Sequence, residues 1–226
     1  MVDAVVRARG LTKTYSDEVQ KLEVLKGIDL EIRKGETVAL MGPSGAGKST
    51  LLHILGLMDS GTSGELEVLG RDARRLEEAE KDAVRNREVG FLFQFHYLLP
   101  GLSLLENTAL PLRIMGMSAS DASKEAAGIL ESVGLGSRLR HLPSRVSGGE
   151  QQRAALARAM TAHPRLLICD EPTGNLDLER GEEVRALIWK MARQEGTAVI
   201  VATHNPDLAR SADRTLRILD GRIAEK

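Results

Sequence analysis

The sequence predicts an α/β fold in which a helical insertion interrupts a mostly parallel core sheet. Short apolar runs bounded by turn residues alternate with helical segments before about residue 95 and again after residue 164. From about residue 103 to residue 163 the pattern is helical, which places a helical insertion near residues 95–163. A glycine-rich loop joins an apolar run at residues 37–41 to a helical segment at residues 49–55, as in a strand-loop-helix unit.

The first part of the chain is expected to contain several strands. Apolar or alternating runs place them at residues 22–25, 28–32, 37–41, 66–70 and 89–93, the last of which ends at Gln94. A turn at Lys34-Gly35 precedes the strand at residues 37–41. Residues 75–87 are highly charged, so they are expected to form a surface helix.

Three helices are expected in the insertion. Ser103 can cap the first, because Glu106 follows it at the spacing of a capping box. Helical periodicity marks the other two at residues 120–133 and 150–162. Since no linker or repeat interrupts the chain, residues 1–226 are predicted to form a single domain with a helical subdomain at about residues 95–163.

The last part of the chain alternates between strands and helices again. Strands are expected at residues 166–169, 197–202 and 216–219, and a helix at residues 179–195. The turn pair Asp220-Gly221 follows the last expected strand.

Composition argues against several functions. The formal net charge is −1 and aromatic residues make up 3% of the chain, so no nucleic-acid surface is expected. The lone Cys169 lies in an apolar run, which favours a core residue over a nucleophile and a reducing compartment over an oxidising one. No signal peptide is recognised, and no apolar run approaches the roughly 20 residues that span a bilayer. If the protein works at a membrane, another chain is therefore expected to supply the membrane-spanning part.

Residues 42–50 fit the phosphate-binding pattern G-x-x-x-x-G-K-[ST]. Glycines let backbone N–H groups curl around phosphate oxygens, and the helix that follows adds the positive end of its dipole. Lys48 would reach the β- and γ-phosphates, and the Ser49 hydroxyl would bind Mg²⁺. The nucleotide is expected to contact Gly42, Ser44, Gly45, Gly47, Lys48, Ser49 and Thr50.

Two carboxylates, Asp170 and Glu171, follow the apolar run at residues 166–169. Parallel strands deliver functional groups at their carboxyl ends. Asp170 is therefore expected to face the Mg²⁺ held by Ser49, directly or through water, and Glu171 to polarise the attacking water. A pair of solvated acids is the alternative, which the nearby phosphate loop disfavours.

The segment Ser147-Gly148-Gly149 begins a helix rich in Ala and Arg. It has two interpretations, a second anion site at a helix N-terminus or an ordinary capped helix. Taken alone, the segment favours the capped helix.

With these residues in view, the chain resembles the ATP-binding subunit of ABC transporters over nearly its whole length. The family's elements occur in order: Tyr15 as the adenine-stacking aromatic, residues 42–50 as Walker A, Gln94 as the Q-loop glutamine, residues 147–151 as the signature motif, residues 169–171 at the end of Walker B, residues 175–177 as the D-loop, and His204 as the switch histidine. Two positions depart from the usual signature, since Val146 and Glu150 replace its Leu and Gln, while Ser147 and Gly149 are retained.

The resemblance implies a P-loop ATPase core with an N-terminal antiparallel β subdomain and a helical signature subdomain. It also implies a head-to-tail dimer of two copies, with ATP between the Walker A loop of one and the signature motif of the other. Ser147 and Gly149 would then contact the γ-phosphate from the opposite copy, and Asp177 would lie beside the nucleotide.

The implied cofactors are ATP and Mg²⁺. The residues implied in catalysis are Glu171, His204, Lys48 and Gln94. The residues implied in holding the metal are Ser49, Gln94 and Asp170. His204 would contact the γ-phosphate and hold Glu171 in place, whereas Gln94 would touch Mg²⁺ or the attacking water.

Within this family, the chain resembles most the subgroup of lipoprotein-releasing, macrolide-export and cell-division ATPases. The residues that carry this narrower resemblance are 94–100, 105–107, 110–112 and 172–177. Among them, residues 95–100 are most similar to the lipoprotein-releasing members. The apolar, partly aromatic segment after Gln94 is suited to receive a helix of a membrane permease. A buried strand-helix connection is the alternative.

Three functions follow from this subgroup. The leading hypothesis is an ATP-driven motor for lipoprotein release, bound peripherally to the cytoplasmic face of the bacterial inner membrane. The others are a macrolide or peptide export ATPase and an ATP-gated interaction module of the cell-division type. ABC proteins of DNA repair are disfavoured because the chain has no sustained heptad run.

Overall fold

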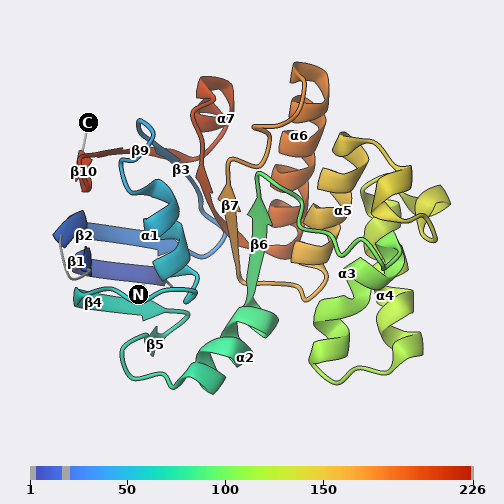
Figure 1. Cartoon of the computed structure of the whole chain (residues 1–226), viewed down its shortest axis with the longest axis horizontal. Coiled ribbons are helices and arrows are strands. Elements are labelled where there is room, and N and C mark those ends of the chain that lie inside the picture. Colours follow the sequence, from blue (N-terminus) through green and yellow to red (C-terminus); the bar gives the residue numbers. More distant parts are fainter. Residues whose placement is uncertain (1–3, 17–20, 225–226) are drawn as a thin grey trace. The chain divides into compact units, whose positions relative to one another are not determined.

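The computed structural model describes residues 4–16 and 21–224. The chain forms two compact units. The first consists of Met1–Arg85, Ile168–Asp170 and Ala198–Lys226, and the second of Asn86–Leu167 and Glu171–Thr197. In Figure 1 the first unit is mostly blue, teal and red, and the second runs from green to orange.

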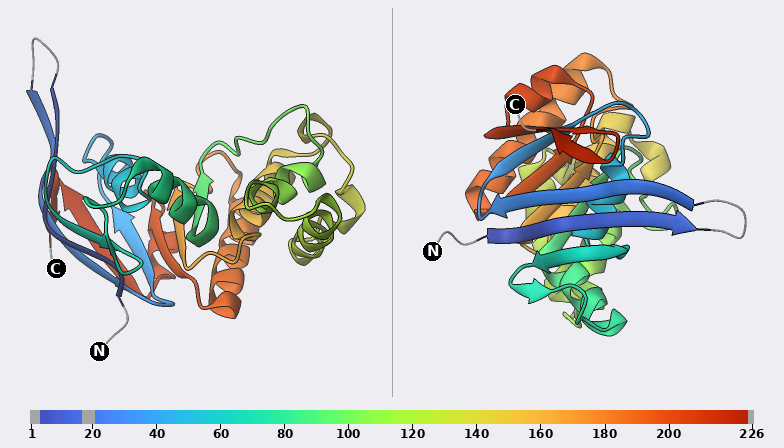
Figure 2. Two further views of the ribbon diagram at one scale, coloured as in Figure 1. Left: turned by 90° about the horizontal axis from the view of Figure 1, so that it is seen from below. Right: turned by 90° about the vertical axis from the view of Figure 1, so that its left-hand side faces the viewer.

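The first unit contains an antiparallel sheet with the strand order β2-β1-β4-β5. Its strands are β1 (Ala4–Ser16), β2 (Lys21–Arg33), β4 (Ser63–Val68) and β5 (Arg71–Asp72). Figure 2 shows β1 and β2 running side by side along their length. Leu25, Ile28, Leu30 and Ile32 bury one face of β2, which explains its alternating sequence.

The strands expected at residues 22–25 and 28–32 are in fact one continuous strand, β2. Gly27 has a φ of +87° in its middle, so the backbone can depart from regular strand geometry there without ending the pairing with β1. The prediction of two separate strands was therefore wrong, because the irregularity at Gly27 interrupts the alternating pattern without ending the strand.

A second sheet in the first unit carries the parallel strands, in the order β10-β9-β3-β8-β7. These strands are β3 (Thr37–Met41), β7 (Leu166–Asp170), β8 (Ala198–Ala202), β9 (Arg214–Leu219) and β10 (Arg222–Ala224). Strand β3 pairs in parallel with both β8 and β9. Its buried residues explain why its sequence is continuously apolar.

The sequence indicates that residues 216–219 form the last strand, and this is wrong. They belong to β9, and the short strand β10 follows it. Asp220 and Gly221 both have positive φ angles, 45° and 72°, and turn the chain so that β10 pairs antiparallel with β9. Three residues are too few to show a strand periodicity.

Two helices belong to the first unit. Helix α1 (Lys48–Leu55) buries Leu51, Leu52, Ile54 and Leu55. Helix α7 (Pro206–Arg210) was not expected, because it is only five residues long. Asn205 caps it by accepting hydrogen bonds from the backbone N–H groups of Asp207 and Leu208.

The second unit is mainly helical. Its elements are β6 (Val89–Phe93), α3 (Leu104–Ile114), α4 (Ala119–Ser132), α5 (Gly148–Met160), α6 (Leu178–Glu195), the short 3₁₀ turns Gly136–Arg138 and Pro143–Arg145, and the end of α2 (Glu78–Glu88). Small side chains let α3 and α4 pack closely around Ala109, Leu112, Ala122 and Ala126. β6 passes so near α5 that a Cβ on Gly90 would lie 2.5 Å from the Ala159 carbonyl oxygen.

Most predicted elements are confirmed to within a few residues at their ends. Both halves of the capping box expected at Ser103 and Glu106 are present. Cys169 is fully buried, and this burial raises the pKa of its thiol, as suits a core residue. Among the described helices, none has the length and apolar character needed to cross a bilayer.

Candidate nucleotide-binding site

The phosphate loop lies between β3 and α1 in the first unit, as the sequence predicts. A Cβ on Gly42 would lie 2.3 Å from the carbonyl oxygen of Ile218, and one on Gly47 would lie 2.9 Å from the Leu25 side chain. Gly47 also has a φ of +100°, a conformation that residues with side chains rarely adopt. Close approach and backbone conformation therefore both require glycine in this loop.

The N-terminus of α1 has the properties of an anion site. Its N-cap is Gly47, no side chain caps its first turn, and that turn contains no acidic residue. The positive end of the helix dipole is therefore not neutralised locally. Ser44 and Gly45 are exposed in front of it.

Lys48 lies against the same loop. Its Nζ donates hydrogen bonds to the carbonyl oxygens of Gly42 (2.8 Å) and Pro43 (3.0 Å). These contacts keep the ammonium group beside the loop, where it adds a positive charge to the helix N-terminus. The loop, helix end and lysine together suit a polyphosphate.

Three further predicted residues lie in the first unit. Ser49 is exposed in the first turn of α1, Asp170 ends β7, and the exposed His204 follows β8. Leu40 of β3 pairs with Ala202 of β8, so the phosphate loop and His204 leave the same edge of the sheet.

The side chains of Ser49 and Asp170 are of the kind that binds a magnesium ion. Both offer oxygen ligands, which Mg²⁺ prefers, and the ion usually completes its octahedron with waters and substrate phosphates. Within the described residues there is no cluster of three or more His, Cys, Asp or Glu able to hold a metal ion.

Tyr15 lies near the end of β1 with 44% of its surface exposed. Its hydroxyl donates to Asp59 Oδ2 at 2.8 Å, and the Lys13 ammonium lies 4.6 Å from the centre of its ring. Burial and the Asp59 carboxylate raise the pKa of Tyr15, while the Thr50 hydroxyl acts in the opposite direction. Sequence reasoning missed Asp59 and Lys13, because neither belongs to a motif.

In the second unit, Gln94 directly follows β6 and is paired with Asn175. The Gln94 amide donates to Asn175 Oδ1 (3.0 Å), and the Asn175 amide donates to the Gln94 carbonyl oxygen (3.2 Å). This reciprocal pair joins the predicted Q-loop to the predicted D-loop.

Gln152 holds the same region from α5. Its buried amide nitrogen donates to the carbonyl oxygens of Phe93 and Pro172, each at 2.8 Å. Phe93 precedes Gln94, and Pro172 follows Glu171. One side chain thus fixes the backbone beside two predicted catalytic residues. The sequence gives no sign of this role, because Gln152 lies in an apparently ordinary amphipathic helix.

Glu171 has a φ of +47°, in the left-handed region that few non-glycine residues adopt. The N–H of Gly174 donates to its carbonyl oxygen at 3.0 Å, closing a turn directly after the strand end. Backbone outliers of this kind concentrate at functional sites. The turn thus begins at Glu171, directly after Asp170, the last residue of β7.

Ser147 caps α5 in a capping box. Its hydroxyl accepts from the N–H of Glu150 (3.3 Å), and the Glu150 carboxylate accepts from the N–H of Ser147 (2.8 Å). This backbone hydrogen bond is the main cause of a lowered pKa at Glu150. Glu150, which replaces the glutamine of the usual signature, therefore completes the cap of α5, in agreement with the capped helix that the sequence favours. The role of Ser147 in binding an anion stays a prediction.

Gly149 and Asp177 lie on neighbouring helix ends. A Cβ on Gly149 would lie 3.0 Å from Cδ of Arg180, whose backbone N–H is capped by the Asp177 side chain. The start of α5, which carries the signature motif, and the start of α6, which follows the D-loop, thus approach each other within the second unit.

The segment after Gln94 is exposed. Phe95, Tyr97 and Leu99 have 60%, 62% and 45% of their surface accessible, whereas Leu98 is buried, so the segment is not a wholly buried connection. Arg158 of α5 donates to the carbonyl oxygens of Tyr97 (2.7 Å) and His96 (2.8 Å), which holds the segment in place.

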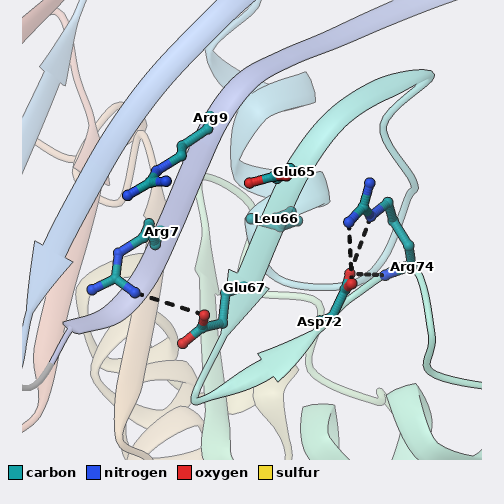
Figure 3. Close-up of a pocket in the computed structure, with 7 residues that line it drawn as sticks. All are labelled: Arg7, Arg9, Glu65, Leu66, Glu67, Asp72 and Arg74. Atoms are coloured by element: carbon teal, nitrogen blue, oxygen red, sulfur yellow. Dashed lines mark hydrogen bonds and ion pairs between the residues drawn. The ribbon is translucent and has the colours of Figure 1, made fainter.

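A hollow of about 280 Å³ lies over β1, β4 and β5 (Figure 3). None of the residues that line it is a predicted site residue. Four of its charged side chains form two ion pairs, since Arg7 meets Glu67 at 3.7 Å and Arg74 meets Asp72 at 3.1 Å. Three arginines face three carboxylates, so the hollow offers no excess charge to a phosphate.

The phosphate loop at the edge of a parallel sheet defines a P-loop nucleotide-binding protein. The sequence pattern of the ABC transporter family matches residues 25–174. The chain therefore belongs to the ABC transporter family, and the α/β fold with its antiparallel sheet and helical unit is that of the family's ATP-binding cassettes.

Curated relatives of similar length support this assignment. The chain is 47% identical to lipoprotein-releasing system ATP-binding protein LolD 2 of Caulobacter vibrioides, covering 99% of this chain and 98% of the relative. It is 46% identical to LolD of Geobacter metallireducens, covering 98% and 99%.

Solved structures of ATP-binding cassettes also support the assignment to this family. The chain is 37% identical to the ATP-binding cassette MJ0796, described as a dimer in a post-hydrolysis state bound to ADP and Pi, with a TM-score of 0.89 and 97% coverage of each chain. A second dimeric structure of MJ0796 gives a TM-score of 0.90 at the same identity and coverage.

Proposed function

We propose that this chain is the ATP-hydrolysing motor subunit of an ABC transporter that drives lipoprotein release from the bacterial inner membrane. The observation that carries the proposal is its near full-length identity of 46–47% to LolD proteins. The phosphate loop, with its uncapped helix N-terminus and adjoining lysine, supports the ATP-binding part of the proposal.

In this proposal the first unit binds the nucleotide. Backbone N–H groups of the phosphate loop and the Lys48 ammonium hold the phosphates, with Ser44 and Thr50 beside them, and the base stacks on Tyr15. Ser49 and Asp170, together with Gln94, would hold Mg²⁺. When bound, this ion would neutralise charge that develops on the phosphate oxygens.

Hydrolysis would use groups from strand ends. Glu171 polarises the attacking water as a general base, and His204 contacts the γ-phosphate and orients Glu171. Gln94 touches Mg²⁺ or the water and reports the nucleotide state. The hydrogen bonds of Gln152 to Phe93 and Pro172 support this assignment, because they fix the backbone on which Gln94 and Glu171 depend.

Two copies would complete each site in a head-to-tail dimer. Ser147 and Gly149 would contact the γ-phosphate bound to the other copy, and Asp177 would lie beside that nucleotide. That MJ0796 is dimeric in both solved structures supports the association of two copies. Closing on ATP and opening after hydrolysis would then be a two-state switch driven by differential contacts.

The motor would act on integral-membrane permease subunits from the cytoplasmic face, as a peripheral protein. The exposed Phe95, Tyr97 and Leu99 support this role, because an apolar and aromatic surface held by Arg158 suits an apolar helix of a partner.

A pull-down with a Glu171→Gln variant tests the proposal. The variant would be trapped with ATP, captured from detergent-solubilised membranes of the source organism, and its partners identified by mass spectrometry. Glu131→Gln, on an exposed part of α4, serves as the matched control. Two related permeases with bound lipoprotein are expected. A single export-type permease, or division proteins, would contradict lipoprotein release, and the absence of any membrane partner would contradict the transporter role.

A further inference from the structure

We propose that Asp59 and Lys13 are positioning residues that fix the ring of Tyr15 for stacking with the nucleotide base. The inference rests on the proposed function, because it assumes that Tyr15 meets the base. It adds two residues that belong to none of the motifs and assigns each a physical task.

Asp59 ties Tyr15 to the end of the phosphate-loop helix. It lies four residues after Leu55, where α1 ends, and its Oδ2 accepts the Tyr15 hydroxyl at 2.8 Å. Its Oδ1 meets the Lys13 ammonium at 2.6 Å. The phenol of Tyr15 is therefore anchored to the chain that leaves the helix binding the phosphates.

Lys13 determines which face of the ring a base can use. Its ammonium lies 4.6 Å from the ring centre and also donates to the carbonyl oxygen of Ser60 at 2.8 Å. The side chain is only 12% exposed, so this position is well defined. Since the cation covers one face of Tyr15, a base must stack on the opposite face.

The backbone supports the same arrangement. The pairing of β1 with β2 shifts register between Lys13 and Thr14, and such irregularities re-aim side chains. The Thr14 N–H donates to Thr62 Oγ1 at 2.9 Å, which binds this part of β1 to the segment after Asp59. Tyr15 is thus held by its backbone, its hydroxyl and one ring face.

The contacts predict a specific energetic effect. A ring held in its stacking orientation loses less conformational freedom when the base arrives, so the base binds more tightly. The phosphates contact a different part of the unit, the loop at residues 42–50. Loss of Asp59 should therefore weaken the binding of the base and leave the binding of the phosphates unchanged.

Calorimetric titration of the full chain with two probes tests this separation. The probes are Mg-ATP and magnesium tripolyphosphate, which has no base. Asp59→Asn is expected to weaken ATP binding about 3- to 10-fold and to change tripolyphosphate binding less than about twofold. Asp220→Asn is the matched control, because Asp220 also meets a lysine, Lys26, at 2.6 Å. It should alter neither probe.

Tyr15→Phe removes only the hydroxyl and keeps the ring, so it tests the contact even if Asp59→Asn folds poorly. It should weaken ATP binding by a similar factor, and the double variant should be no weaker than either single one. Lys13→Met should weaken ATP selectively as well.

Equal weakening of both probes by Asp59→Asn would overturn the proposal, since Asp59 would then support the helix rather than the ring. Unchanged ATP binding in both Asp59→Asn and Tyr15→Phe would also overturn it. If the native chain bound neither probe, the proposed function itself would fail, which is a distinct result.

Discussion

The two units of the molecule prepare their predicted site residues by different physical means. In the first unit the phosphate loop is shaped by its backbone, with glycine required at Gly42 and Gly47 and Lys48 held by main-chain oxygens. In the second unit the predicted site residues are held by side chains instead. Gln152 donates hydrogen bonds to the backbone beside Gln94 and Glu171, and Asn175 pairs with Gln94.

This difference has a consequence for the kind of substitution each unit tolerates. A site shaped by backbone is sensitive to an added Cβ and to lost charge. A site held by buried side-chain hydrogen bonds is sensitive to the loss of an amide, because the carbonyl oxygens left behind become unsatisfied. Substitutions in the two units should therefore differ in their effects on activity and stability. We expect the largest effect at Lys48 and the smallest at His163.

The largest effect is expected from Lys48→Ala. Removing the ammonium deletes the one charged group held within the phosphate loop and leaves the backbone cradle in place. ATPase activity should fall by about 100-fold or more, since phosphoryl transfer depends strongly on positive groups that stabilise the charge of the transition state. A steady-state phosphate-release assay measures it, with the exposed Lys34→Ala as control. Retention of near-native activity would contradict the role assigned to Lys48.

Gln152→Leu should be the most damaging substitution of a polar residue in the second unit. It leaves the carbonyl oxygens of Phe93 and Pro172 without their donor, which should lower the free energy of unfolding by about 1–3 kcal/mol. ATPase activity should fall too, because the backbone beside Gln94 and Glu171 loses its anchor. Denaturant unfolding and the phosphate-release assay measure the two effects. Gln194→Ala, exposed on α6, should change neither.

Ser147→Ala and Ser103→Ala form a matched pair, because both serines cap helices of the second unit through capping boxes. Each should cost about 1 kcal/mol of unfolding free energy. Only Ser147→Ala should also reduce ATPase activity, since Ser147 is proposed to contact the γ-phosphate of the other copy. Equal activity in the two variants would make Ser147 an ordinary cap.

The smallest effect is a pH dependence at His163. Burial lowers the pKa of this histidine, but its hydrogen bonds to Glu195 (3.0 Å) and Glu125 (3.2 Å) raise it above 6.5 overall. Its stabilising contribution is therefore complete below pH 6.5 and lost as the pH rises through the folded-state pKa.

Because His163 is about half exposed, the loss should remain below about 1 kcal/mol. Denaturant unfolding at pH 6 and pH 8 measures it. In His163→Gln the difference in stability between the two pH values should shrink. An unchanged difference would show that the histidine does not interact with the two carboxylates in solution.

Much of the fold was predictable because apolar runs mark the buried strands, as at residues 37–41 and 89–93, and helical periodicity marks the longer helices. Two of the errors lie where one or two residues decide the geometry. Gly27 sits inside a continuous strand, and Asp220-Gly221 turns the chain into an unexpected hairpin.

The motif residues of the candidate site were also predictable, because glycine loops and strand-end carboxylates carry local sequence patterns. Their supports were not. Gln152 contacts residues 59 and 20 positions away, and Asp59 contacts Tyr15 from 44 positions away. One sequence holds no record of such distant pairs, so only the fold reveals them.

The central claim is that ATP binds at the phosphate loop of one copy and that the signature motif of a second copy completes the site. Sedimentation velocity of the Glu171→Gln variant with and without Mg-ATP tests it most directly. A dimer that forms only with ATP, together with loss of phosphate release, is the predicted result. A monomer at saturating ATP, or phosphate release at the native rate, would contradict the account.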